Sequence, residues 1–401
     1  MDIVSTGSTA DGAPAGDDAN ERQDFGARKA KHLEICVESS RFEVETGATG
    51  FDQVRLVHTS LPELSLDEVD TSVEFLGRRV ALPVLISSMT GGSSEGFRAN
   101  KDLARAAQQL QVPVGMGSIR VLFSHPEVFE HFHLKKLAPD VPVMANIGGV
   151  QVRDLDHRKL IEMLKRLEVE ALVIHLNPGQ ELFQPEGDRD FRGVIDAIRA
   201  LCDLSPLPLI AKETGFGIRP SDIQRLLDAG VEWVNVAGSG GTNWVKVESY
   251  RLDPAMRTCA EEFDQWGLGT ALILAAAQEF RGSLIASGGV RDGLDVAKSI
   301  ALGAGMAGIA LPFIRAVHRA GVDGVIEFTE RLTRVLRTAM LLSGARNVAQ
   351  LQQTPTMWSP AFRAAVLELR AAESARIQPE RGGDFQTNST HAGSSARVRN
   401  K

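Results

Sequence analysis

The sequence predicts an α/β fold, a (β/α)8 TIM barrel with an N-terminal extension and disordered tails. Three observations favour it. Short apolar runs alternate with amphipathic stretches between residues 80 and 345. The alternation repeats eight times, as in a barrel of roughly 250 residues. Polar, glycine-rich residues follow the apolar runs. A doubly wound open sheet is the alternative, but it usually has fewer repeats.

The eight predicted strands are mostly continuous apolar runs, as parallel strands covered on both faces should be. In chain order they occupy residues 83–88, 113–117, 142–147, 171–177, 208–212, 232–238, 283–289 and 304–311. The amphipathic stretches between them predict helices at residues 100–111, 125–138, 153–167, 189–202, 219–230, 270–280, 292–303 and from 311 onward.

The chemistry of such a barrel lies at its C-terminal face, where strands end and loops begin. Seven of the predicted strands end in polar, glycine-rich sequence: SSMTGG, GMGSIR, ANIGG, HLNPGQE, AKETGFG, AGSGGTN and SGGVRDG. One such ending is compatible with an ordinary loop. Seven of them predict a large ligand that lies across the barrel mouth.

The composition predicts a soluble, cytoplasmic protein with no nucleic-acid partner and no membrane segment. A net charge of −7 is unlike that of general nucleic-acid binders. The three cysteines are too scattered for a disulfide framework or a zinc site. No apolar run is long enough to span a membrane, and the N-terminus lacks a signal-peptide pattern. Residues 1–25 and 378–401 have few core-forming side chains, so disordered tails are expected around a domain of residues 26–377.

The end of the fourth predicted strand carries candidate catalytic residues. Side chains alternate along a strand, so His175 and Asn177 share one face while the residues between and before them on the other face are apolar. We therefore expect His175 and Asn177 to point into the barrel, with Gln180 close behind. For His175 alone, a buried imidazole bonded to a neighbour is the alternative. Together the three residues are predicted to be catalytic.

The loop after this strand also offers metal ligands. Glu181, Glu186 and Asp188 supply hard oxygen atoms, and Mg²⁺ prefers one or two carboxylates together with substrate phosphate oxygens. Asp188 precedes a predicted helix and is better explained as its N-cap. Glu181 has no such structural role in the sequence, so it is the predicted metal ligand.

Lys212 ends the fifth predicted strand and points inward if Ile210 does. A lysine inside a barrel needs an anionic partner, because an unpaired buried charge is very costly. A reduced flavin ring, which is negative near N1, is one candidate. A salt bridge to an acidic residue of another strand is the alternative.

Two further segments predict sites for phosphate groups. Gly288 and Gly289 after the seventh strand allow a phosphate to approach the backbone, and Arg291 adds charge. The basic cluster RKAKH begins at Arg28 and Lys29, before the barrel. It is either a solvated helix face or a lid that brings cations to a diphosphate.

These motifs together resemble type 2 isopentenyl diphosphate isomerase, the flavin-dependent family. The resemblance runs from about residue 28 to 352 through RKAKH, SSMTGG, GMGSIR, ANIGG, HLNPGQELFQPEGDRDF, KETGFG, GGTNWVKVE, ASGGVRDGLDVAKSIALGA and RTAMLLSGA. The fourth-strand motif is the most specific, whereas the glycine motifs are shared with other FMN barrels. The resemblance implies a barrel that binds FMN and Mg²⁺, with NADPH reducing the flavin. It implies interconversion of isopentenyl diphosphate and dimethylallyl diphosphate, in a homo-oligomer that is a tetramer or octamer.

The resemblance also implies roles for individual residues. FMN would be contacted by Ser88, Met89, Thr90, Ser118, Asn146, Lys212 and Thr242. The FMN phosphate would lie at Gly289, Val290, Arg291, Ala310 and Leu311. The substrate diphosphate would meet Arg28, Lys29, Ser118, Arg120, His175 and Asn177, with Gln180 near the reacting carbons and Glu181 on the metal.

The implied reaction adds a proton at one carbon and removes one from another, with no net oxidation. No ordinary pair of side chains has obvious reach and strength for this in an apolar pocket. The hypothesis is therefore that reduced flavin is the acid–base group.

The chain departs from the family pattern at one position. The family usually has Ser-Gln-Arg after the second strand, whereas this chain has Ser118, Ile119 and Arg120. Either the diphosphate loses a contact there or the local loop differs.

Three other functions are compatible with a flavin barrel. A 2-hydroxy acid oxidase needs a His–Arg pair late in the barrel, and Arg291 has no neighbouring histidine. A dehydrogenase that uses a loop cysteine is disfavoured, because Cys36 and Cys202 fall in helical patterns and Cys259 in a polar insertion. A flavin-binding protein without catalysis is disfavoured by the presence of Gln180, Glu181 and Arg28.

Overall fold

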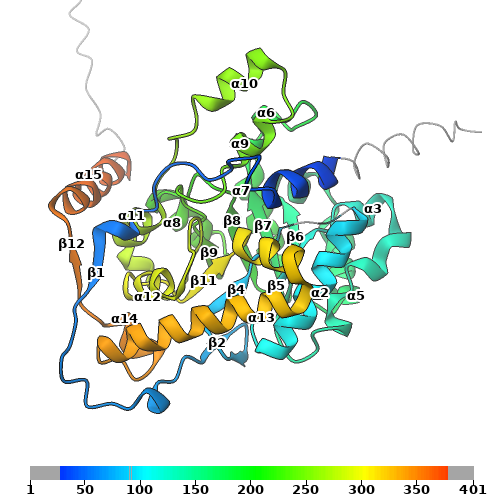
Figure 1. The fold of residues 1–401 in the computed structure, drawn as a ribbon. Coiled ribbons are helices and arrows are strands. Elements are labelled where there is room, and N and C mark those ends of the chain that lie inside the picture. The colour runs from blue at the N-terminus through cyan, green and yellow to red at the C-terminus, as the bar shows by residue number, and fades with distance from the viewer. Residues whose placement is uncertain (1–27, 90, 92, 378–401) are drawn as a thin grey trace, which may run out of the picture.

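A computed structural model describes residues 28–89, 91 and 93–377. Both predicted tails lie outside these residues. The described chain forms one closed barrel of eight parallel strands with helices around it (Figure 1). The strands are β4 (Val84–Ile86), β5 (Val114–Ser118), β6 (Val143–Gly148), β7 (Ala171–Leu176), β8 (Leu209–Glu213), β9 (Trp233–Asn235), β10 (Leu284–Ala286) and β11 (Met306–Ile309). Each predicted strand is present, and β11 pairs with β4 to close the ring, so the barrel prediction is confirmed.

Most of the predicted helices are also present in the outer ring. They are α2 (Ser94–Leu110), α4 (Gly149–Asp154), α5 (His157–Leu167), α7 (Val194–Leu204), α8 (Pro220–Asp228), α11 (Thr270–Ala276), α12 (Gly293–Ala301) and α13 (Leu311–Leu342). The short 3-10 helix η5 (Gln278–Phe280) follows α11.

The helix predicted at residues 125–138 was wrong. The chain there forms short pieces, α3 (Val121–Ser124), η3 (Pro126–His131) and η4 (Leu134–Lys136). Phe132 and Leu134 are both buried in the core. Residues two apart point in different directions on an α-helix, so a break between η3 and η4 allows both side chains to be buried.

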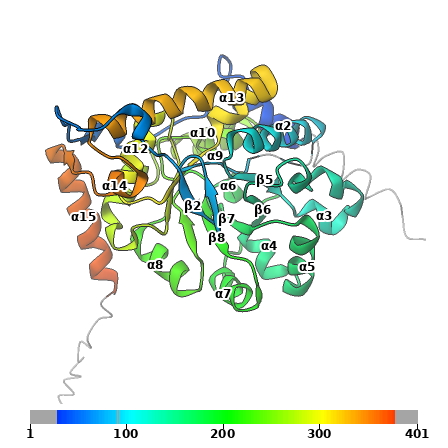
Figure 2. The ribbon, with the colours of Figure 1, turned by 90° about the horizontal axis from the view of Figure 1, so that it is seen from below.

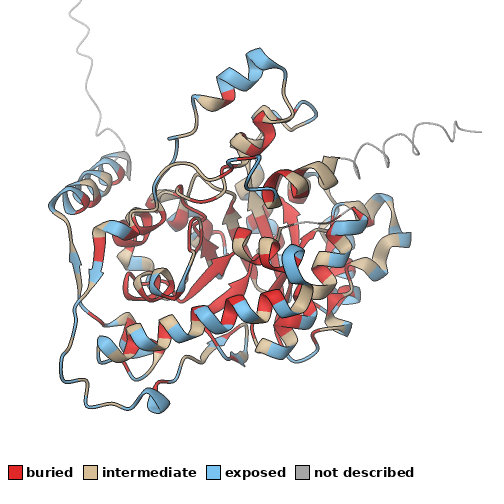
Figure 3. Cartoon of the chain, in the orientation of Figure 1, coloured by how far each residue is buried: buried red, intermediate tan, exposed pale blue. Residues whose placement is uncertain are grey.

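The core has two layers that follow the alternation of side chains along the strands. Ala171, Val173 and Ile210 belong to a cluster inside the barrel. Leu172 and Ile174 belong to the larger cluster between the barrel and its helices. The predicted facing of β7 and β8 is therefore confirmed, and His175 and Lys212 continue the inward-facing rows. Figure 3 shows the barrel strands as the most buried part of the fold.

A hairpin that the sequence did not predict covers the N-terminal end of the barrel. Its strands, β2 (Val73–Phe75) and β3 (Arg78–Val80), pair antiparallel. Leu76 and Gly77 both have positive φ, as a tight hairpin turn requires. Phe75 and Val80 complete the inner cluster, so side chains close this end of the barrel, across which Figure 2 shows the hairpin.

Segments from both ends of the described chain wrap the barrel. A helix over residues 28–37 lies at the mouth. The chain then passes through η1 (Phe51–Gln53), β1 (Val54–Leu56) and η2 (Leu66–Glu68). At the other end are α14 (Val348–Gln352), β12 (Thr356–Trp358), which pairs with β1, and α15 (Pro360–Ile377), which packs on α11 and α8.

Three helices in the loops form a second layer above the mouth (Figure 1). They are α6 (Pro178–Phe183), α9 (Trp244–Ser249) and α10 (Pro254–Glu261). α6 follows β7 and packs on α9, which follows β9. Among the described residues, none of the helices is long and apolar enough to cross a membrane.

Candidate active site at the barrel mouth

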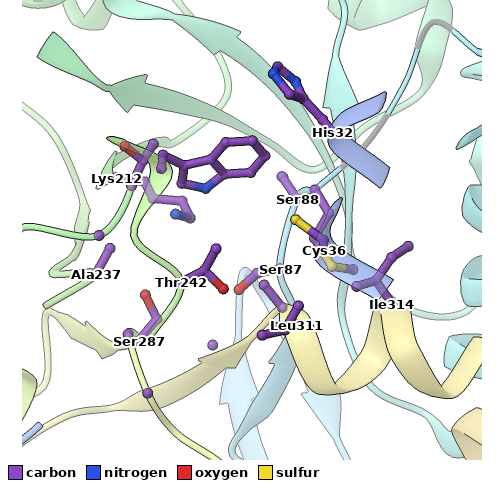
Figure 4. A pocket seen from close by; sticks show the side chains of 18 of the residues that line it. His32, Cys36, Ser87, Ser88, Lys212, Ala237, Thr242, Ser287, Leu311 and Ile314 are labelled. Carbon is purple, nitrogen blue, oxygen red and sulfur yellow. The ribbon is translucent and has the colours of Figure 1, made fainter. Parts of the chain in front are cut away.

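A cavity opens at the C-terminal ends of the strands (Figure 4). The ends of β4 and β8 to β11 form its floor and walls, and the helix over residues 28–37 covers it. Of the predicted site residues, those that line the cavity are Lys29, Ser88, Met89, Lys212, Thr242, Gly289, Arg291, Ala310 and Leu311. Thr90, another predicted FMN contact, lies outside the described residues.

One end of the cavity is built from backbone. Gly288 and Gly289 have φ of 90° and 74°, which favours glycine. A Cβ at Gly289 would lie 2.1 Å from the Cγ2 atom of Thr49 and 2.5 Å from the carbonyl oxygen of Gly240. Val290 is buried in the core, so it can offer only its backbone here. The cradle suits a phosphate bound through backbone N–H groups.

Arg291 does not point freely into this cradle. Its Nε donates to a carboxylate oxygen of Glu45 over 2.8 Å, and Arg315 Nη1 donates to the other oxygen over 3.2 Å. Arg315 Nε also donates to the carbonyl of Cys36, in the covering helix. Through these contacts, Glu45 connects the segment after the covering helix with the loop after β10.

Two serine hydroxyls at the end of β4 are buried. The Oγ atoms of Ser87 and Ser88 have no hydrogen-bond partner among the described residues, although both side chains line the cavity. A buried hydroxyl without a partner is costly. Together with the glycine cradle, these hydroxyls fit a polar cofactor such as FMN that enters the cavity.

Lys212 extends into the cavity from β8 (Figure 4). Its Nζ donates to the carbonyl oxygen of Glu213 over 2.6 Å, and no described carboxylate forms an ion pair with it. The salt bridge considered as an alternative is therefore absent from the described part of the chain. Burial lowers the pKa of Lys212 to about 8. An anion bound beside this ammonium would stabilise its protonated form.

A second group of predicted residues lies on β5, β6 and β7. Asn146 pairs in register with Ser118 on one side, and its Oδ1 lies 2.9 Å from His175 Nδ1. Burial, then the charges of Lys29 and Lys212, lower the pKa of His175 to about 3. The imidazole is therefore neutral at physiological pH, and Asn146 as an acceptor fixes the proton on Nδ1.

The residues after β7 contact one another on α6. Asn177 Nδ2 donates to Gln180 Oε1 over 3.1 Å and to Glu181 Oε1 over 2.8 Å. The other oxygen of Glu181 accepts the backbone N–H of Asp188 over 3.0 Å. Glu181 therefore does have a structural role, contrary to the reasoning from sequence. The N-cap prediction for Asp188 was also wrong, because α7 begins after Gly193.

No three or more His, Cys, Asp or Glu side chains gather at a common point within residues 28–89, 91 and 93–377. A metal at Glu181 would thus depend on oxygens from a substrate. Such sharing is usual for Mg²⁺.

Glu248 on α9 is a site residue that the sequence reasoning missed. Its side chain is fully buried, with Gln180 Nε2 at 2.9 Å, His32 Nε2 at 3.0 Å and Arg251 Nη1 at 2.5 Å. The hydrogen bonds and charges of these neighbours outweigh burial and lower the pKa of Glu248 to about 2. It stands in the quoted motif GGTNWVKVE, but nothing in its spacing there distinguishes it from the glutamate of an amphipathic helix.

The covering helix has one face toward the site. Lys29 and His32 line the cavity, and burial beside Arg28 lowers the pKa of Lys29 to about 8. Arg28 forms an ion pair with Glu186 in the loop after α6. Lys31 lies on the outer side and pairs with a glutamate of its own helix. The solvated-face interpretation therefore holds for Lys31, and the helix as a whole covers the mouth.

The two residues after β5 lie apart from the cavity. Arg120 is exposed, and its backbone N–H donates to Ser118 Oγ over 3.4 Å. Ile119, which replaces the glutamine usual in the resembled family, is fully buried in the main core. Ile119 is not among the residues that line the cavity.

The sequence is similar to known proteins over most of its length. The sequence matches the family of FMN-dependent dehydrogenases over residues 38–177 and 190–358. It is 40% identical over 326 residues to an isopentenyl-diphosphate delta-isomerase of Borrelia garinii, with 81% of this chain and 91% of the relative covered. Relatives of the same name from Pyrococcus abyssi (40% identical, 82% and 91% covered) and Nostoc (41%, 82% and 95%) are similar.

Solved structures match the fold at much lower identity. A variant of mandelate oxidase with an FMN adduct superposes with a TM-score of 0.55 at 20% identity, covering 82% of this chain and 99% of its own. This likeness concerns the fold alone.

Proposed function

The chain belongs to the FMN-dependent dehydrogenase family and, within it, to the isopentenyl-diphosphate delta-isomerases. From that premise we propose that it interconverts isopentenyl diphosphate and dimethylallyl diphosphate on FMN bound in the cavity at the barrel mouth. We further propose that Mg²⁺ accompanies the diphosphate, that NADPH reduces the flavin, and that the protein acts as a cytoplasmic tetramer or octamer.

One observation carries the proposal. The cavity that fits a flavin is bounded by Lys29 and His32, and His32 shares the carboxylate of Glu248 with Gln180. The Lys29 cation for a diphosphate and an oriented amide for its hydrocarbon therefore lie beside one cofactor pocket.

The residues proposed to contact FMN offer different kinds of interaction. The backbone at Gly289 fits the phosphate, and the unpartnered hydroxyls of Ser87 and Ser88 fit polar edges of the ring system or ribityl chain. Lys212 offers a cation in the cavity wall that forms no ion pair with a described carboxylate. When bound in its reduced state, FMN supplies an acid–base nitrogen and an electron-rich ring.

The residues proposed to contact the substrate bind it and orient it. Lys29 supplies charge to the diphosphate, and neutral His175 offers Nε2 as a hydrogen-bond acceptor beside it. Glu181, held by Asn177, is the proposed Mg²⁺ ligand. Glu248 and Asn177 hold the amide of Gln180 from its two ends, which fixes one orientation of this amide near the reacting carbons.

The alternatives have less support. Arg291 is bound by Glu45, and the loop after β10 contains no histidine for the His–Arg pair of an oxidase. Cys36 does line the cavity, but burial raises the pKa of its thiol to about 12, so it is a poor nucleophile.

An anaerobic assay tests the proposal. Purified protein with FMN, Mg²⁺ and isopentenyl diphosphate should form dimethylallyl diphosphate once NADPH or dithionite is added, with far less NADPH consumed than product formed. Consumption of oxygen with a 2-hydroxy acid would instead indicate an oxidase. Absence of product with flavin bound and reduced would overturn the isomerase proposal.

A further inference from the structure

A second concave surface lies outside the flavin cavity, beside the loop after β10. Its lining comes from Glu45, from Arg291, and from two separate parts of α13: Pro312, Arg315, Ala316 and Arg319, then Glu327, Phe328 and Arg331. We call it the arginine groove. Its volume is about 390 Å³, within the range of small-molecule sites.

A bend in α13 creates the groove. Ala320 and Gly321 have non-helical backbone angles, with φ of 57° at Gly321, so the helix runs as two segments in different directions (Figure 1). Arg319 lies just before the bend and Arg331 three turns after it. A straight helix could not direct both side chains into one concavity.

Positive charge is in excess inside the groove. Four arginines face two glutamates. Glu45 is shared by Arg291 and Arg315, and Glu327 pairs with Arg319 over 2.7 Å. The guanidinium of Arg331 lies 5.7 Å from the ring centre of Phe328. Two guanidinium charges therefore exceed the carboxylates, in a chain whose net charge is −7.

This arrangement suits a phosphate ester on a flat ring. Guanidinium groups bind phosphate through two parallel hydrogen bonds. Apolar side chains also line the groove, namely Pro312, Ala316 and the largely buried Phe328. Inorganic anions need no such lining, whereas a nucleotide offers both an aromatic base and a phosphate ester.

The groove also adjoins the flavin cavity. Arg291 lines both spaces. A ligand long enough to lie in the groove and extend past Arg291 would approach the flavin site from its phosphate side. A dinucleotide has that length.

We propose that the arginine groove binds the 2′-phosphoadenosine end of the dinucleotide that reduces the flavin, and so selects NADPH over NADH. This inference rests on the proposed reduction of FMN by NADPH. It assigns Arg319 and Arg331 as the residues that discriminate between the two dinucleotides.

The test combines Arg319→Ala with Arg331→Ala. Both side chains are exposed, so the fold should be retained. The NADPH concentration for half-maximal flavin reduction, measured anaerobically by loss of flavin absorbance, should rise roughly ten-fold or more, since charge-assisted hydrogen bonds are lost. The value for NADH should be unchanged. The control is Arg334→Ala, which removes the same charge from α13 outside the groove.

Binding of adenosine 2′,5′-bisphosphate and of inorganic phosphate, measured by calorimetry, distinguishes the ligand class. The bisphosphate should bind the parent protein and not the double variant. The inference is overturned if the double variant weakens NADPH and NADH equally, if it weakens neither, or if inorganic phosphate binds as tightly as the bisphosphate. Turnover after dithionite reduction tests the isomerase proposal separately, because it needs no dinucleotide.

Discussion

Glu248 accepts a hydrogen bond from Gln180 Nε2 over 2.9 Å while its side chain is completely buried. The same carboxylate lies 3.0 Å from His32. Glu248 therefore joins α9, α6 and the helix that covers the mouth, which are far apart in the sequence. Its pKa of about 2 means that it carries its charge throughout the physiological range.

Glu248→Gln should lower the isomerase turnover number by about ten-fold or more, because one neutral amide cannot accept from three donors and leaves Arg251 without its buried counter-charge. FMN content should stay near that of the parent protein, since Glu248 does not line the cavity. Glu261→Gln on the exposed α10 is the control, and it should leave turnover unchanged. Equal turnover in the parent and Glu248→Gln proteins would show that the contact does not orient Gln180.

Substrate affinity should depend on the charge of Lys29. Its pKa in the ligand-free protein is lowered to about 8, so the ammonium loses its proton as the pH rises through 8. The diphosphate prefers the protonated form, and its apparent Kd should therefore rise above pH 8, up to about ten-fold per pH unit for one linked proton. Titrations of FMN-loaded protein between pH 7 and 9.5 measure this.

Lys29→Arg should remove the rise in Kd, since arginine stays charged. Lys31→Met, which removes a charge from the outer face of the same helix, should keep it. A Lys29→Arg protein with the parent pH profile would exclude Lys29 as the source.

The fold and much of the site could be predicted because strand periodicity is local. The alternation through Val173 and His175, and through Ile210 and Lys212, is enough to assign inward faces, and the register of β7 with β8 brings His175 and Lys212 to the same level. Gly289 could likewise be assigned to the barrel mouth, because it stands at the end of a predicted strand.

Contacts between distant loops could not be predicted in this way. In the sequence, Glu248 resembles any glutamate of an amphipathic helix, and its role follows only from the packing of α9 on α6. Glu45 likewise has no local sequence feature that predicts Arg291 and Arg315 as its partners. Ile119 illustrates the same limit. Its change from the family pattern suggested either a lost contact or a different local loop, but only the packing of the loop after β5 shows that this side chain lies in the core.

The stability of the ligand-free protein should fall in mild acid because of His175. The pKa of this imidazole is lowered from 6.5 to about 3 in the fold, so the unfolded chain binds the proton more readily. The free energy of unfolding therefore decreases as the pH falls below 6.5, by up to about 1.4 kcal/mol per unit from this group. Urea titrations should show that the free energy of unfolding changes less between pH 5 and pH 7 in His175→Gln than in the parent protein. The same difference in both proteins would contradict the assignment.

Gly289→Ala should abolish FMN retention. The new methyl group would lie 2.1 Å from Thr49 Cγ2 and 2.5 Å from the Gly240 carbonyl, so the loop that fits the phosphate must move. Gly282→Ala is a matched control, because Gly282 also has positive φ (91°) but has no atom within 4 Å of the added methyl group. Both variants carry the backbone cost of alanine at positive φ, about 1–2 kcal/mol. Gly289→Ala carries in addition the cost of overpacking, typically about 1–3 kcal/mol. Flavin absorbance per chain after gel filtration should be near zero for Gly289→Ala and unchanged for Gly282→Ala, and urea titration of the flavin-free proteins should rank their stabilities in the same order. If Gly289→Ala keeps its flavin, the phosphate does not lie against this loop.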